Sequence, residues 1–259
     1  MSEKKYSAPA LEKGLDILEL LSEEEFGLSQ VEIARNLNRS VSEIFRMIVV
    51  LQDRRYVMLD PHSDKYMLTT FLFEVAHRTP LVKRLTSLAG PAMRRMTVKI
   101  NQSAHLTILS GDHVLVIGQV DSPGDNVMSV RLGAKIGIWR ASSGRVILAY
   151  LPDEALLETI DKAPLPTDMS LEDIQQELIH IRNIGHEVMD SYVVSGIVNI
   201  SAPIIDHSGL AIAALTVPHI KRLDDLTSFT DCVSSLLEVT KSLSASLGGD
   251  AAASAEVLS

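Results

Sequence analysis

The chain has 259 residues and a formal net charge of −9, and at roughly 100–200 residues per domain this length favours two domains. Its apolar runs are far shorter than the roughly 20 residues that span a bilayer, and residues 1–9 lack the apolar run of a signal peptide. One cysteine, Cys232, excludes an internal disulfide framework and a multi-cysteine metal cluster. We therefore expect a soluble, cytoplasmic protein.

The charge is distributed unevenly along the chain. Residues 1–152 hold 19 Lys and Arg against 16 Asp and Glu, whereas residues 153–259 hold 5 against 17. This asymmetry indicates different roles for the two halves. Because the positive excess of the first half is small, any contact with DNA must come from locally placed side chains.

Two short helices are expected first. One covers residues 10–21, where leucines recur at the spacing of one helical face. Its expected buried residues are Leu11, Leu15, Leu18 and either Leu20 or Leu21. The other begins after Ser29, which has Glu32 three residues later in the arrangement of a capping box. The expected buried residues of this helix are Val31, Ala34 and Leu37.

A third helix and a hairpin complete the N-terminal region. Either Ser40 or Ser42 caps the helix, and its apolar stripe consists of Ile44, Met47, Ile48 and Leu51. Two strand-like runs, residues 56–59 and 65–68, then flank a turn-rich segment, which predicts a β-hairpin. The order predicts a winged helix–turn–helix, in which the third helix fits the major groove of DNA.

Residues 71–100 have a helical pattern with expected interruptions at Pro80 and at Gly90–Pro91. The expected apolar face comprises Leu81, Leu85, Leu88, Met93 and Met96. Farther on, strands are expected at residues 105–109, 114–120, 127–132, 197–205 and 210–217, and helices at residues 142–150, 171–183 and 226–247. The fold class is therefore α+β, and residues 248–259 are expected to form a disordered tail.

Several short segments, in this order and separation, resemble the IclR family of bacterial transcriptional regulators over residues 10–247. They are residues 10–18, 41–47, 133–135, 143–145, 148–152, 195–197 and 201–204. The resemblance implies a winged helix at residues 1–78, a dimerising helical linker at 79–100 and a GAF-like α/β effector-binding domain at 101–247. It also implies dimers or dimers of dimers that bind palindromic operators and repress or activate transcription.

The chain departs from the family within the implied effector pocket. Asn199 stands where many relatives have a cysteine, and Thr216 with Pro218 stands where many have a serine pair. An acidic run common in relatives is reduced to Asp190. These differences argue against a glyoxylate- or pyruvate-like effector and favour a different ligand.

The candidate DNA contacts gather near the start of the third helix. An arginine there can pair with guanine, a glutamate can accept from cytosine N4, and serines can bind bases or phosphates. Arg46 is either a base reader, a phosphate contact or a packing residue, and the alternative for the whole set is an ordinary solvated face. The candidates are Arg39, Ser40, Ser42, Glu43, Arg46 and Lys65.

The candidate effector site centres on residues 138–144, because backbone N–H groups at a helix start favour a carboxylate and Arg140 can add a charge-assisted bond. The alternative is that Ser142 or Ser143 is only an N-cap. Trp139 is either a pocket wall or a domain-interface residue. The candidates, several placed by the resemblance, are Met128, Trp139, Arg140, Ala141, Ser142, Ser143, Asp190, Asn199, Ser201 and Thr216.

Two other classes of protein are alternatives: an enzyme, and a DNA-binding assembly protein with a vestigial ligand domain. The sequence has no G-x-S-x-G elbow and no phosphate-binding loop, and its histidines are scattered without metal-binding spacing. We therefore predict a DNA-binding regulator without catalytic residues, metal or cofactor. Its operator affinity is expected to depend on a small organic effector that bears a carboxylate.

Overall fold

The computed structural model describes residues 8–77, 80–125, 127–222 and 227–249. The chain divides into two compact units, residues 1–83 and 84–259. Within the described residues, no helix is both long enough and apolar enough to cross a bilayer.

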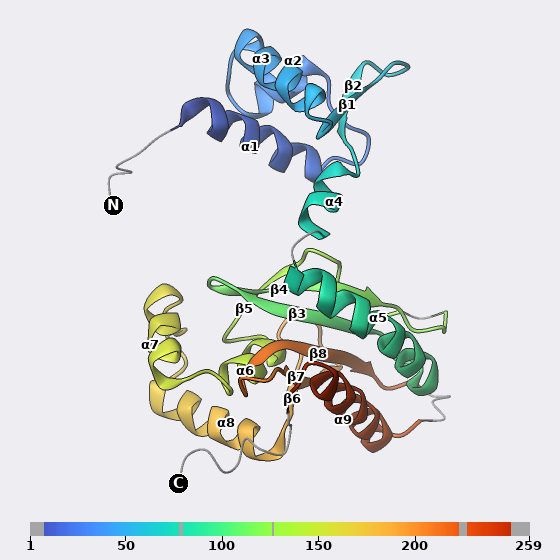
Figure 1. Ribbon diagram of the computed structural model, residues 1–259, viewed down its shortest axis with the longest axis vertical. Coiled ribbons are helices and arrows are strands. Elements are labelled where there is room, and N and C mark those ends of the chain that lie inside the picture. Colours follow the sequence, from blue (N-terminus) through green and yellow to red (C-terminus); the bar gives the residue numbers. More distant parts are fainter. Residues whose placement is uncertain (1–7, 78–79, 126, 223–226, 250–259) are drawn as a thin grey trace. The chain divides into compact units, whose positions relative to one another are not determined.

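The N-terminal unit is the expected three-helix array with a hairpin (Figure 1). Its elements are α1 (Pro9–Ser22), α2 (Gln30–Asn36), α3 (Val41–Asp53), β1 (Val57–Asp60), β2 (Lys65–Leu68) and α4 (Phe71–His77). The strands pair antiparallel, with Val57 opposite Leu68 and Asp60 opposite Lys65. Ser29 caps α2 and Ser40, not Ser42, caps α3, each in a capping box with a glutamate three residues on.

The core of this unit confirms only part of the expected face of α1: Leu18 and Leu21 pack into it, and Leu11 and Leu15 do not. Ile17 and Leu21 are buried against α3, whereas Leu11 is 62% exposed and Leu15 is also exposed. Leucines occur on several sides of this helix, so their spacing alone did not select the buried side. The same correction applies to α2, which buries Ile33 and leaves Val31 exposed. The stripe of α3 is confirmed.

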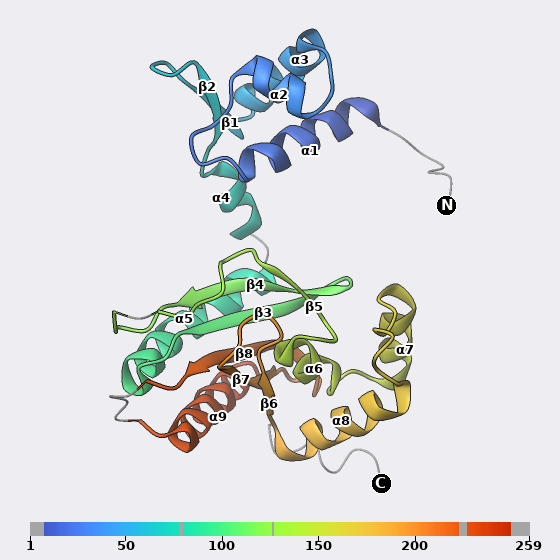
Figure 2. The same ribbon diagram turned by 180° about the vertical axis from the view of Figure 1, so that it is seen from behind.

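The C-terminal unit contains a six-stranded antiparallel sheet in the order β5-β4-β3-β8-β7-β6. Its strands are β3 (Ala104–Ser110), β4 (His113–Val120), β5 (Lys135–Gly137), β6 (Glu187–Asp190), β7 (Ile197–Ile205) and β8 (Ala211–Ile220). Its helices are α5 (Pro80–Ile100), α6 (Ser142–Leu148), α7 (Asp153–Lys162), α8 (Leu171–Ile184) and α9 (Phe229–Ser246). One face of the sheet carries α5 and α9, and the other carries α6 (Figures 1 and 2).

α5 passes through Gly90–Pro91 without the expected interruption. A side chain before proline normally clashes with the proline ring in helical geometry, and Gly90 has no Cβ to make that clash. The expected apolar face is also corrected, because Leu81 is 45% exposed and Leu88 is exposed, while Leu85, Met93 and Met96 are buried. The role of residues 79–100 as a linker stays a prediction.

The strand expected at residues 127–132 is absent, and the edge strand is β5 instead. Gly133 N donates to Val116 O, and Val116 N donates to Ala134 O, so this pairing with β4 begins only at residue 133. Just before it, the backbone N–H of Leu132 donates to Gln119 Oε1 at 3.1 Å. This side-chain contact holds residues 128–132 as a loop beside the sheet. The β7–β8 hairpin was predicted correctly. The predicted tail is wrong at its first two residues, because Gly248 pairs with Asp206 and Gly249 N donates to Ser244 O. Its remainder, residues 250–259, lies outside the described residues.

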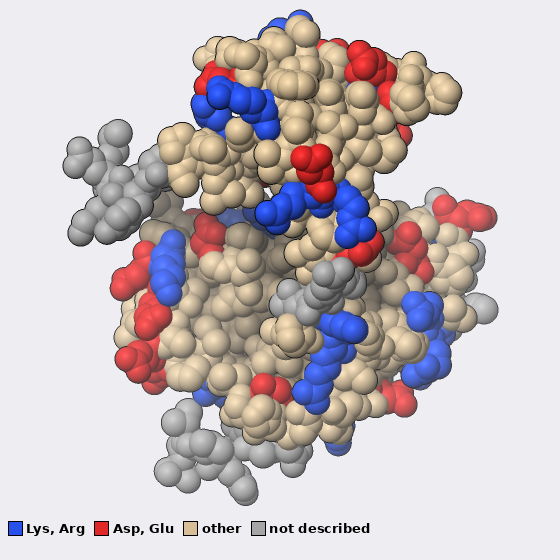
Figure 3. Space-filling model, turned by 45° about the horizontal axis from the view of Figure 1, so that its top comes forward, with Lys and Arg blue, Asp and Glu red and all other residues tan. Residues whose placement is uncertain are grey.

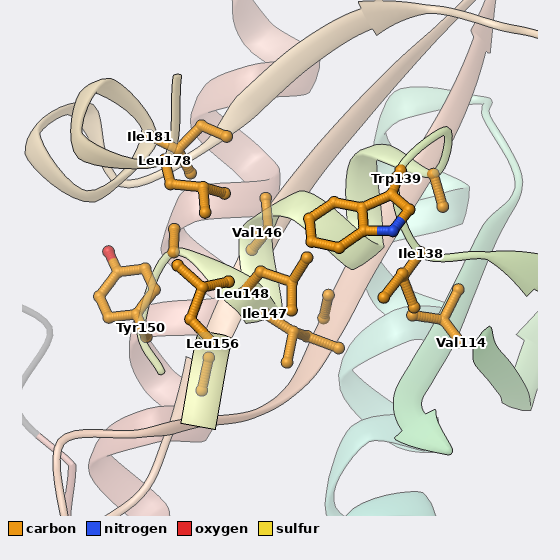
Figure 4. Packing of buried hydrophobic residues seen from close by; sticks show 14 of the residues in the cluster. Val114, Ile138, Trp139, Val146, Ile147, Leu148, Tyr150, Leu156, Leu178 and Ile181 are labelled. Carbon is orange, nitrogen blue, oxygen red and sulfur yellow. The ribbon is translucent and has the colours of Figure 1, made fainter. Parts of the chain in front are cut away.

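The core beneath α6 positions the segment that precedes it (Figure 4). Trp139 and Ile138 lie at one side of a cluster that includes Val146, Leu148 and Leu178. A Cβ on Gly144 would lie 2.2 Å from the carbonyl oxygen of Ile138. Glycine at 144 therefore lets the chain before α6 pass directly against the first turn of that helix.

Candidate nucleic-acid interface and ligand cavity

α3 presents an outer face opposite the residues that it buries. Ile44 and Ile48 are fully buried, and exposed residues recur three and four positions apart around the rest of the helix. The exposed residues are Val41, Ser42, Phe45, Arg46, Val49 and Val50. Phe45 is 50% exposed beside Arg46. The sequence analysis did not include Phe45 among the candidate DNA contacts. Its position just outside the apolar stripe of the helix could have indicated an exposed aromatic residue.

Two of the predicted DNA contacts are tied to each other within the unit. The backbone N–H and the hydroxyl of Ser40 donate to Glu43 Oε2 at 3.2 and 2.8 Å. Lys13 Nζ donates to Glu43 Oε1 at 2.5 Å. The hydrogen bond from Lys13, followed by those from Ser40, lowers the pKa of Glu43 to about 2. Glu43 is thus ionised and held at the start of α3.

The other predicted DNA contacts differ in their bonding partners and in the elements to which they belong. Arg39 donates to Asp16 Oδ2 at 3.2 Å, and the hydroxyl oxygens of Ser42 and Ser40 lie 3.3 Å apart. Ser42 and Arg46 lie one turn apart on the exposed face of α3. Lys65 begins β2 in the hairpin, so it belongs to a different element from the other five. Figure 3 shows basic and acidic side chains interspersed over one face of the molecule. Local side chains, not a broad positive field, would therefore determine contacts with DNA.

A cavity of about 890 Å³ lies in the C-terminal unit, on the side of the sheet that α6 covers. Its walls come from residues 128–143, which include β5 and the start of α6, from the end of α7 and the loop after it (162–166), and from residues 191–194. Its floor comes from β3, β7 and β8. Eight of the ten predicted effector residues line it: Met128, Trp139, Arg140, Ala141, Ser142, Ser143, Asn199 and Thr216. Asp190 is exposed on β6, and Ser201 lies in the sheet without being part of the lining.

A row of polar residues crosses the sheet at this floor. His105 on β3 is the direct partner of Thr216 on β8, which is the direct partner of Ser201 on β7. Side chains at directly opposed positions share one face of the sheet. Ser201 Oγ lies 2.7 Å from Thr216 Oγ1 and 2.7 Å from Ser142 Oγ of α6. Ser142 is not the N-cap of α6, since Ala141 occupies that position.

His105 differs from its hydroxyl neighbours. It lines the cavity and is 3% exposed, and its Nδ1 has no hydrogen-bond partner among the described residues. Burial lowers the pKa of His105 to about 4. The ring is therefore neutral at physiological pH, and sequence analysis, which set His105 aside among scattered histidines, missed it.

Four basic residues line the cavity against a single carboxylate, Asp112; the four are Arg131, Lys135, Arg140 and Lys162. This is notable because residues 101–259 hold only 9 Lys and Arg against 20 Asp and Glu. Arg140 donates to both carboxylate oxygens of Asp168 at 2.8 and 2.9 Å, and its guanidinium lies 4.4 Å from the centre of the Tyr192 ring. Lys162 Nζ donates to Glu158 Oε2 at 3.3 Å. Basic side chains therefore gather around the cavity within an acidic half of the chain, and the carboxylates of Asp168 and Glu158 offset part of their charge.

Trp139 is a cavity wall fixed from within its own unit. Its indole Nε1 donates to the carbonyl oxygen of Ala163 at 2.7 Å, and the side chain is buried in the cluster beneath α6. Ala163 also lines the cavity, so this bond joins two of its walls. In the part of the chain that the structure describes, no three His, Cys, Asp or Glu side chains are grouped so as to hold a metal ion.

The chain matches two family models. Residues 74–245 match the C-terminal domain of the bacterial transcriptional regulator IclR, and residues 10–61 match the IclR helix-turn-helix domain. A curated relative, the HTH-type transcriptional repressor AllR of Escherichia coli strain K12, is 27% identical over 215 residues, which cover 81% of this chain and 79% of that protein.

Solved structures give the same result for the fold. The IclR of Thermotoga maritima has a TM-score of 0.74 and 25% identity, covering 92% of this chain and 98% of that one. An IclR homologue of Microbacterium hydrocarbonoxydans, complexed with 4-hydroxybenzoate, has a TM-score of 0.77 and 22% identity over the same shares of the two chains. Both likenesses extend over the two units.

Proposed function

Because the chain belongs to the IclR family of bacterial transcriptional regulators, we propose that it binds its operator through α3 and that a carboxylate-bearing effector in the cavity changes this binding. The observation that carries the proposal is the concentration of basic residues around a large cavity in an otherwise acidic half of the chain. An anion that enters the cavity meets favourable charge, whereas a cation does not.

On the DNA side, α3 enters the major groove with Ser42, Phe45 and Arg46 toward the bases. Arg46 pairs with a guanine, and Phe45 contacts a thymine methyl group, the apolar feature of the major groove. Arg39 and Lys65 bind phosphates. Ser40 and Glu43 act mainly by fixing the start of α3, since their polar groups bond each other and Lys13.

The operator-bound form is a dimer or a dimer of dimers. The N-terminal unit is small, and two copies on a palindromic site combine two weak contacts into one strong interaction. Exposed apolar side chains of α4 and α5 form the surface that contacts a second copy; they are Leu72, Val75, Leu81 and Leu88. Leu85 is buried within the chain, so we do not include it in the proposed dimer surface of α4 and α5.

On the effector side, the ligand carries its carboxylate at the basic rim and an apolar body against Trp139, Met128 and Ile138. Arg140 exchanges its bond with Asp168 for the ligand carboxylate, or keeps it while Arg131 and Lys135 bind the ligand. The 4-hydroxybenzoate in a structural neighbour is an acid of this class. For regulation, the ligand must bind the operator-competent and incompetent forms unequally.

An assembly protein with a vestigial ligand domain is the alternative. The cavity of about 890 Å³ favours the sensor, because its size and its largely apolar lining with a few polar groups are those of pockets that bind small molecules. The curated relatives of this chain are transcriptional regulators, which favours a ligand-binding domain over an enzyme.

Calorimetry with a panel of aliphatic and aromatic carboxylic acids, with and without operator DNA, tests the proposal. At least one acid should bind, and its affinity should differ between the free and operator-bound protein. The single variants Lys135→Gln and Arg131→Gln should each weaken this binding. Lys241→Gln, which also removes one positive charge but lies on the exposed surface of α9, should not. Equal affinity with and without operator would make the domain a binder and not a switch.

A further inference from the structure

We propose that His105 recognises a hydroxyl group of the effector, so that the ligand is a hydroxylated acid with its hydroxyl at the cavity floor and its carboxylate at the rim. This inference rests on the proposed function and specifies the chemistry of the same cavity. A neutral imidazole at the cavity floor differs in chemistry both from the basic residues at the rim and from the apolar walls.

The first step is the unsatisfied nitrogen of His105. A buried polar atom without a partner costs free energy, and native proteins keep few such atoms. Among the described residues, His105 Nδ1 is one of only two buried side-chain nitrogen or oxygen atoms without a hydrogen bond, and the residue lines the cavity. Its neighbours in the polar row bond each other, so they do not supply the missing partner.

The second step is the charge of the ring. Since burial favours the neutral form of His105 at physiological pH, the residue does not add to the positive rim and is not an anchor for a carboxylate. A neutral imidazole has one nitrogen that donates and one that accepts, and the tautomer decides which is which. A hydroxyl group can bond to either kind of nitrogen, because it both donates and accepts.

A ligand can reach the imidazole of His105, and hydroxyl groups lie beside this ring. Rotation of the imidazole by half a turn exchanges Nδ1 with Cδ2 at nearly unchanged volume, so the nitrogen can meet a ligand without movement of β3. Thr216, the direct partner of His105, also lines the cavity and is linked to Ser201 and Ser142. A ligand hydroxyl at this floor can therefore join a row of hydroxyl groups whose protons reorient together.

The test uses pairs of acids that differ by one hydroxyl group: 4-hydroxybenzoate with benzoate, 4-hydroxyphenylacetate with phenylacetate, and 3-(4-hydroxyphenyl)propionate with 3-phenylpropionate. Dissociation constants are measured for the full chain and for His105→Leu and His105→Gln. In the parent protein, the hydroxylated member of at least one pair should bind about tenfold more tightly. His105→Leu should abolish this preference and keep affinity for the unhydroxylated acid, and His105→Gln should retain part of it.

A direct readout accompanies the affinities. The ¹⁵N resonances of the His105 ring should shift when the hydroxylated acid binds and should shift less with its unhydroxylated partner. If acids bind with the same hydroxyl preference in the parent and in both variants, the role of His105 is refuted while the proposed effector class stands. If no acid of the panel binds the parent protein, the proposed effector class fails, and this inference fails with it.

Discussion

The hydroxyl oxygen of Ser142, the first residue of α6, lies 2.7 Å from that of Ser201 on β7. Ser201 is also bonded to Thr216, so its hydroxyl joins the helix to two strands. Ser201→Ala leaves two buried hydroxyls without this partner and should lower the free energy of unfolding by about 1–3 kcal/mol. Urea unfolding measures the loss. Ser246→Ala, on an exposed surface of α9, is the control and should change stability by less than about 0.5 kcal/mol.

Gly144→Ala should destabilise the C-terminal unit, because the new Cβ would lie 2.2 Å from the backbone oxygen of Ile138. The backbone must shift, and overpacking of this kind costs typically 1–3 kcal/mol. Gly14→Ala is a matched control in α1, where no atom lies within 4 Å of the new Cβ. That change should stabilise α1 by up to about 1 kcal/mol. Calorimetric unfolding that shows equal effects of the two changes would contradict the close contact at Gly144.

Phe45→Ala should weaken operator binding by removing an apolar contact with a thymine methyl group, at a cost of about 1 kcal/mol. The measurement compares an operator duplex, defined by footprinting, with duplexes in which single thymines are replaced by uracil. The parent protein should lose affinity at one such position, and Phe45→Ala should lose nothing more there. Val31→Ala, an exposed change on α2, serves as the control. A uracil effect of the same size in Phe45→Ala would exclude this contact.

Arg46→Ala should reduce operator affinity by roughly 1–3 kcal/mol if the residue reads a base. The loss should disappear on duplexes in which the contacted guanine is already replaced. A loss that is uniform across all sequences, with a lower salt dependence, would identify Arg46 as a phosphate contact instead.

The sequence predicted the N-terminal unit well because its signals are local. The capping box at Ser29 and the turn between β1 and β2 depend on residues only a few positions apart. The choice between Ser40 and Ser42 as the cap of α3 was left open, and the structure assigns it to Ser40. The prediction that Leu11 and Leu15 of α1 are buried was wrong for the opposite reason. Ile17 is buried because α3 and the hairpin pack against its side of α1. The spacing of leucines within α1 does not show where those neighbours lie.

Local sequence patterns also predicted only part of the cavity. Residues 138–144 were found from a local pattern, and the resemblance placed Met128, Asn199 and Thr216 near them. His105 and Lys162 could not be found in this way, because the sheet register brings His105 to the cavity and the end of α7 brings Lys162 there from distant parts of the chain. Nor could the pattern show that Arg140 is already bonded to Asp168.

Glu187 should make stability fall as the pH rises through neutrality. Burial in the folded unit raises the pKa of its carboxyl to about 7 from an unfolded value near 4.5; Arg145, 3.9 Å away, opposes the shift and Glu177 adds to it. Between these two values the folded state holds more protons than the unfolded state, so stability decreases with rising pH. The contribution is complete below pH 4.5 and is lost as the pH passes through 7.

Glu187→Gln keeps a neutral side chain at every pH and removes this loss. The melting temperature of the variant relative to the parent should therefore increase from pH 4.5 to pH 8, while other titrating groups cancel in the comparison. Glu238→Gln is the control, because Glu238 is exposed and its ion pair with Lys99 contributes little to stability. A difference between Glu187→Gln and the parent that stays constant over this range would show that Glu187 ionises alike in the folded and unfolded states.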